Sequence, residues 1–180
     1  MRILGRVLAL FWLAVALSGI AWTADTPSGG DAAKAAFARL KGLAGEWRGT
    51  LGSKDGPPTR VVYRVTGAGS VVVETLFPET DHEMLTVYHM SGDALVLTHY
   101  CAAGNQPRMR LDTSASAPGR LVFAFDGGTN LDPAVDNHMH SGVLTFKDTD
   151  HLEAEWAGYQ KGQPQATHRF LLERVPAVMK

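Results

Sequence analysis

Ten short segments rich in β-branched and aromatic residues follow one another from residue 47 to residue 175. Turn-forming residues such as Gly67-Ala68-Gly69 and Ser91-Gly92-Asp93 separate them, which is typical of consecutive antiparallel strands. Closing such a meander into a barrel removes the two exposed edges that an open sheet leaves. We therefore predict an all-β fold, an up-and-down barrel of roughly ten antiparallel strands with a short N-terminal helix. The predicted strands cover residues 47–51, 60–66, 70–77, 82–90, 94–101, 108–112, 120–125, 138–147, 151–159 and 167–175.

The first 24 residues have the features of an export signal. Arg2 and Arg6 are followed by an apolar run over residues 7–20, which is shorter than the roughly 20 residues that span a bilayer. Small residues then predict cleavage after Ala21 or Ala24. We expect a periplasmic or secreted protein that keeps no stable membrane anchor once residues 1–24 are removed.

The rest of the chain is predicted to be one domain. Residues 25–31 are small and polar and predict a flexible lead-in. Asp31 is expected to cap a short helix over residues 32–40. No linker divides residues 32–176, which we assign to a single β-barrel domain.

Composition excludes some partners and one kind of cross-link. Without residues 1–24 the chain has slightly more acidic than basic side chains and no basic cluster, which argues against a nucleic-acid partner. Cys101 is the single cysteine, so no disulfide forms within one chain.

Alternation along each strand predicts which side chains point into the barrel. The tight Ser91-Gly92-Asp93 connection makes even positions on one strand face odd positions on the next. The inner face of this pair is predicted to carry His82, Met84, Thr86, Tyr88, Met90, Leu95, Leu97, His99 and Cys101. The inner sets expected on the later strands are Leu121, Phe123 and Phe125; His138, His140, Gly142, Leu144 and Phe146; Leu152, Ala154 and Trp156; and His168, Phe170, Leu172 and Arg174.

These inner faces predict a cavity for a small apolar or amphipathic ligand. Aromatic side chains would form its wall, and histidines would supply polar anchors, because imidazole is costly to bury without a partner. The predicted ligand-binding residues are Trp47, Tyr88, His99, Phe123, Phe125, His138, His140, Trp156 and His168.

Two other functions fit the same histidines. His138 and His140 project from one side of a strand, and with His99 and Cys101 they could hold copper or zinc. Haem is a further possibility, since one inward histidine suffices as its proximal ligand. The second alternative is a small enzyme with a histidine general base, for which no orienting carboxylate can be assigned.

The segment Leu43-Ala44-Gly45-Glu46-Trp47-Arg48-Gly49 resembles the opening of calycin-type barrels, which include lipocalins, fatty-acid-binding proteins and nitrobindin-like haem barrels. Those families place a Gly-x-Trp on the first strand, matched here by Gly45 and Trp47, and many pack a basic residue of the last strand across it, as Arg174 could. The segments 87–90, 98–110 and 138–140 are similar to uncharacterised exported bacterial proteins of the DUF1579 or nitrobindin-like kind. The resemblance covers residues 35–176 and implies a cavity for a hydrophobic ligand or haem.

Overall fold

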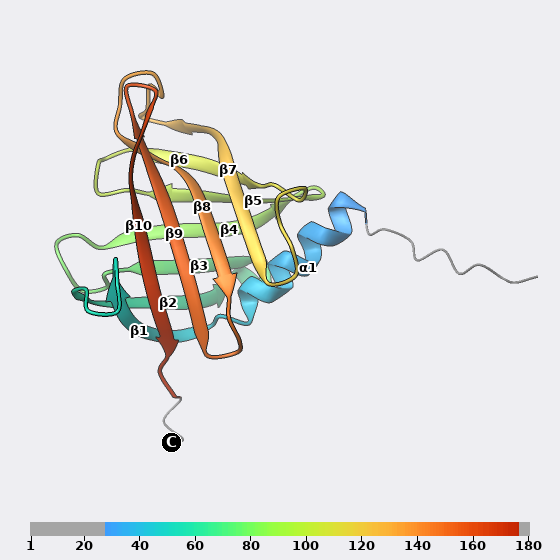
Figure 1. The fold of residues 1–180 in the computed structure, drawn as a ribbon. Helices are drawn as coiled ribbons and strands as arrows, with labels where there is room; N and C mark the ends of the chain where they lie inside the picture. Colours follow the sequence, from blue (N-terminus) through green and yellow to red (C-terminus); the bar gives the residue numbers. More distant parts are fainter. Residues whose placement is uncertain (1–27, 177–180) are drawn as a thin grey trace, which may run out of the picture.

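A computed structural model describes residues 28–176 as a closed antiparallel barrel of ten strands (Figure 1). Each strand pairs with its neighbours in the chain, and the first strand pairs with the last to close the barrel. The predicted fold class is confirmed. The strands are β1 Gly45–Leu51, β2 Pro58–Thr66, β3 Val71–Leu76, β4 Met84–Ser91, β5 Ala94–Tyr100, β6 Gln106–Leu111, β7 Arg120–Thr129, β8 His138–Phe146, β9 His151–Gln160 and β10 Gln163–Arg174.

Helix α1 (Gly29–Lys41) lies across one end of the barrel (Figure 1). Its buried side chains are Ala33, Ala36, Phe37 and Leu40, so its apolar face covers the core at that end. The prediction that Asp31 caps the helix is wrong. Ser28 is the cap, and its hydroxyl accepts a hydrogen bond from the Asp31 backbone N–H at 3.2 Å. The helix therefore begins inside the expected 25–31 lead-in.

Contacts between β1 and β10 stabilise the same end of the barrel. Gly45 adopts a φ of +133°, a conformation that favours glycine, and Trp47 follows it into the core. The Arg174 guanidinium lies 4.3 Å from the Trp47 ring and donates hydrogen bonds to the carbonyls of Ala44 and Gly42, each at 2.9 Å. The expected packing of a basic residue on Trp47 is confirmed.

Replacing Arg174 with methionine is expected to lower the free energy of unfolding by about 2 kcal/mol. The variant loses the cation–π contact with Trp47 and the hydrogen bonds to the carbonyls of Ala44 and Gly42. Arg174→Lys should recover less than half of that loss, because one ammonium cannot reproduce the planar fork. Urea denaturation of the two variants measures both effects. A lysine variant as stable as the original protein would contradict this account of the contact.

The register of β4 and β5 matches the prediction from their short turn. Thr86 is opposite His99 and Tyr88 is opposite Leu97, and all four side chains are buried. No helix within residues 28–176 is long and apolar enough to cross a membrane.

Candidate functional site

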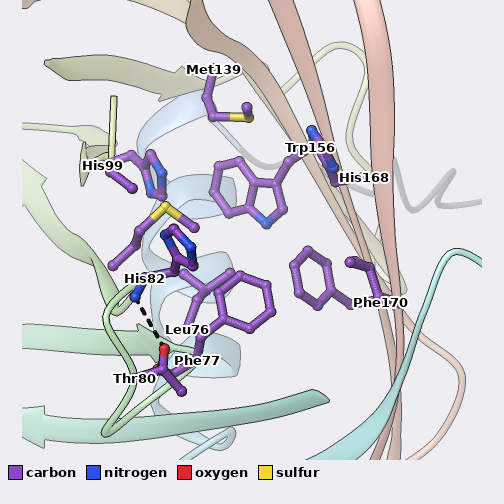
Figure 2. Close-up of a pocket in the computed structure, with 12 residues that line it drawn as sticks. Leu76, Phe77, Thr80, His82, His99, Met139, Trp156, His168 and Phe170 are labelled. Carbon is purple, nitrogen blue, oxygen red and sulfur yellow. Dashed lines mark hydrogen bonds between the residues drawn. The ribbon is translucent and has the colours of Figure 1, made fainter. Parts of the chain in front are cut away.

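A cavity of about 540 Å³ opens at the end of the barrel opposite α1 (Figure 2). It is lined by side chains from seven strands or their connections, most of them apolar or aromatic. The lining residues are Leu51, Leu76, Phe77, Thr80, His82, Met84, His99, Ala102, Met139, Trp156, His168 and Phe170. Volume and lining are in the range of small-molecule sites in proteins.

Trp156 and His99 form a buried part of this wall. Their rings stack with centroids 5.5 Å apart at 27°, and each residue is at most 3% exposed. Gly142 lies opposite Trp156 on β8, and a Cβ there would be 2.8 Å from the indole ring. The glycine therefore leaves the space in which the indole lies. The indole nitrogen is buried and has no hydrogen-bond partner in residues 28–176.

A row of polar side chains continues from His99 into the core. Tyr63, Glu74, Thr86 and His99 are successive cross-strand partners on β2, β3, β4 and β5. Glu74 is 1% exposed and accepts hydrogen bonds from the hydroxyls of Tyr63 at 2.8 Å and Tyr88 at 2.6 Å. Every oxygen of this buried carboxyl thus has a partner, as the interior requires.

Burial changes the acid–base behaviour of this row. It raises the pKa of the Glu74 carboxyl, against which the hydrogen bonds from Tyr88, Tyr63 and Thr86 act. Burial, followed by the charge of Glu74, also raises the pKa of both phenols. Burial lowers the pKa of His99 to about 4, so its ring is neutral at pH 7.

The structure places the nine predicted ligand-binding residues in four locations. His99, Trp156 and His168 line the cavity. Trp47 is at the opposite end beneath Arg174. Tyr88 and Phe123 pack against each other in the filled core, with ring centroids 5.7 Å apart.

The remaining three, Phe125, His138 and His140, form a separate aromatic cluster with Tyr159. A bulge between Met139 and Ser141 interrupts the alternation of β8. As a result Met139 lines the cavity, and the histidines on either side of it do not appear among the lining residues. His138 is nevertheless 1% exposed and both rings contact Phe125, so the two histidines pack beside the cavity without lining it.

Within this cluster the two histidines bond to each other. The Asp136 carbonyl is 2.9 Å from Nδ1 of His138, which must donate, so in the neutral ring Nε2 of His138 accepts from Nδ1 of His140 at 3.0 Å. The His140 ring is stacked on Phe125 at 4.6 Å and on Tyr159 at 3.9 Å. Burial, followed by the charge of His138, lowers the pKa of His140.

The four predicted metal ligands do not come together. His138 and His140 are in the aromatic cluster, His99 stacks on Trp156 in the cavity, and Cys101 is half-buried in the turn after β5. Within residues 28–176, no three His, Cys, Asp or Glu side chains are placed to hold one metal ion. The structure therefore gives the copper or zinc prediction no support in this region.

The general-base prediction required a cavity histidine held by a carboxylate. His99 is held by the hydroxyl of Thr86 instead, at 3.0 Å from Nδ1. The histidine that does meet a carboxylate is His151, 2.9 Å from Asp148 in the exposed turn between β8 and β9. That turn is at the α1 end of the barrel, far from the cavity mouth.

Sequence reasoning missed Glu74 and the connection between β3 and β4. Glu74 alternates with Val72 and Leu76 on the buried face of β3, which is the signal that could have found it. The connection contributes Phe77, Thr80 and His82 to the cavity, and Phe77 has a φ of +51°. The alternation of inward and outward residues along a strand does not predict where the side chains of such a connection lie.

Comparisons with known proteins bear on the fold. No protein-family model and no curated protein sequence matches this chain. A protein of unknown function of the DUF3598 family from Nostoc punctiforme PCC 73102 is similar in structure, with 17% identity, a TM-score of 0.50, and coverage of 76% of this chain and 48% of that one. The Rv2717c protein of M. tuberculosis has 15% identity, a TM-score of 0.48, and coverage of 78% and 98%.

This chain therefore spans about half the length of the Nostoc protein. A likeness at 17% identity shows a shared fold alone. Together with the strand order, it identifies the chain as a closed ten-stranded antiparallel barrel that fits the calycin-like fold.

Proposed function

We propose that this protein is an exported binding protein that takes a small, largely apolar molecule into the open end of its barrel. The observation that carries the proposal is the cavity of about 540 Å³ at that end. Most of the side chains that line it are apolar or aromatic. Because α1 covers the other end of the barrel, a ligand would enter and leave by the one open end. Export rests on the apolar run over residues 7–20, which lies outside the described residues.

The proposal includes kinship with exported bacterial barrels of the DUF1579 or nitrobindin-like kind, supported by the segments around Gly45, His99 and His138. Haem binding stays a prediction. Of the three histidines on the cavity wall, His99 uses one ring nitrogen on Thr86, and His82 and His168 are exposed at the mouth.

Titration with Nile red, a neutral dye that fluoresces in apolar surroundings, tests the proposal. We expect saturable binding to the protein without residues 1–24. Ala102 lines the cavity and its neighbour Ala103 does not, although both are exposed in the turn after β5. Ala102→Trp should weaken dye binding by about fivefold or more, because the indole occupies the mouth of a site whose affinity depends on buried apolar surface.

Ala103→Trp is the matched control and should change the affinity by less than about twofold, because surface substitutions away from a site have small effects. Dye fluorescence that does not saturate, or equal weakening by both variants, would count against a ligand site in this cavity.

A further inference from the structure

The inner end of the cavity has one hydrogen-bonding nitrogen on each of two facing rings. On His99, Nδ1 is engaged by the Thr86 hydroxyl at 3.0 Å, which leaves Nε2 for a ligand. On Trp156, Nε1 has no partner in residues 28–176. Figure 2 shows the two rings adjacent, with the nitrogen-bearing edge of the indole directed toward Phe77 and Phe170.

The polar row behind His99 determines what Nε2 offers. Glu74 is the cross-strand partner of Thr86, and the Thr86 hydroxyl stabilises the carboxylate form of Glu74. A hydroxyl has one hydrogen to donate, so a Thr86 that donates to Glu74 must accept from Nδ1–H of His99. His99 then presents the lone pair of Nε2 as an acceptor.

Trp156 offers the complementary group. An indole N–H can only donate, and a buried donor without a partner costs free energy that native proteins seldom leave uncompensated. Its nitrogen is covered by protein, so the surrounding side chains must shift for a ligand atom to reach it. An acceptor from a ligand is the partner that this donor lacks.

The lining of the cavity also limits the charge of the ligand. Within residues 28–176 it contains no Asp, Glu, Lys or Arg, and its innermost titratable group, His99, is neutral at pH 7. His82 and His168 are exposed at the mouth. A carboxylate or ammonium group carried to the inner end would lose its hydration without gaining a partner of opposite charge.

We propose that the cavity selects an uncharged, largely apolar alcohol, whose hydroxyl donates to Nε2 of His99 and accepts from Nε1–H of Trp156. A hydroxyl is the smallest neutral group that donates and accepts at once, as this pair of nitrogens requires. The inference rests on the proposed function, because it assigns the ligand class of the same cavity.

Displacement of Nile red by 1-decanol, decanoate and decylamine at pH 7 tests the selectivity. The three share one alkyl chain and differ in the charge of the head group. We expect 1-decanol to bind about tenfold more tightly than either charged compound, because burial of an unpaired charge is costly. Decanoate or decylamine binding as tightly as 1-decanol would overturn the assignment.

Trp156→Phe tests the hydrogen bond, because it keeps an aromatic ring and removes the N–H. It should weaken 1-decanol binding by about five- to tenfold, as expected for one buried hydrogen bond. Trp47→Phe is the control, because the Trp47 N–H donates to the Leu43 carbonyl at the α1 end. It should leave 1-decanol binding unchanged.

The outcomes separate this inference from the proposed function. If Nile red binds but 1-decanol affinity is the same in Trp156→Phe as in the original protein, the alcohol assignment fails and the cavity still binds apolar molecules. If neither the dye nor any of the three amphiphiles binds, both proposals fail.

Discussion

Replacing Glu74 with alanine is expected to lower the free energy of unfolding by about 4 kcal/mol. The hydroxyls of Tyr63 and Tyr88 both donate to this carboxyl, and all three residues are at most 2% exposed. Without Glu74 two buried hydroxyls lose their acceptor, at about 1–3 kcal/mol each, and a void is left beneath the cavity. Urea denaturation at pH 7 measures the loss.

Two other glutamate variants serve as controls for Glu74→Ala. Glu74→Gln keeps the shape and one acceptor oxygen, and should cost about half as much as alanine. Glu155→Ala removes a carboxylate from β9 that is 39% exposed and lies 3.7 Å from Arg169, and should cost less than about 1 kcal/mol. A loss of that small size for Glu74→Ala would show that the carboxyl does not hold the two phenols.

The reason for keeping a buried carboxyl can also be tested. The triple variant Tyr63→Phe, Glu74→Leu and Tyr88→Phe removes the donors together with their acceptor and is expected to recover most of the lost stability. Thr86 and His99 still bond to each other in it. If the apolar version is as stable as the original, the polar row is not needed for folding, which favours a role at the cavity.

The topology of the barrel could be predicted from the sequence because local signals agree with it. Gly92 adopts a positive φ in the turn between β4 and β5, and Thr86 and Tyr88 alternate with outward residues up to that turn. The register of such a hairpin follows from its turn, so its inner face follows as well. The Gly-x-Trp at Gly45 and Trp47 likewise predicted the contact with Arg174.

The site could be predicted in part, and the misses have physical causes. One extra residue at the bulge near His140 brings Met139 to the cavity wall, and a bulge leaves no mark in an alternating pattern. Glu74 is a charged residue type that is seldom buried, so its inward position depends on Tyr63 and Tyr88 from other strands. The Phe77 side chain reaches the cavity from a connection with a backbone conformation unusual for its residue type.

His99 is expected to make the barrel less stable as the pH falls. Burial lowers its pKa in the folded state to about 4, against 6.5 for an unperturbed histidine. Between these two pH values the unfolded chain binds a proton at this site and the folded barrel does not. The free energy of unfolding must then rise with pH across the window, by about 3 kcal/mol in total, and level off above it.

Glu74 has the opposite effect on the pH dependence of stability. Its pKa is raised in the folded state, so just above pH 4.5 the folded barrel binds a proton at this site that the unfolded chain does not, and stability falls as the pH rises. The contribution of His99 is therefore obtained by difference, from urea denaturation of the original protein and His99→Gln at a series of pH values. The stability difference between the two should grow by about 3 kcal/mol from pH 4 to pH 7. His151→Gln is the comparison, because the hydrogen bond to the Asp148 carboxylate raises the pKa of His151. The stability difference between the original protein and His151→Gln should therefore fall, and not grow, as the pH rises. A difference for His99→Gln that does not vary with pH would mean that His99 titrates alike in the folded and unfolded chains, and that the inner end of the cavity is open to water.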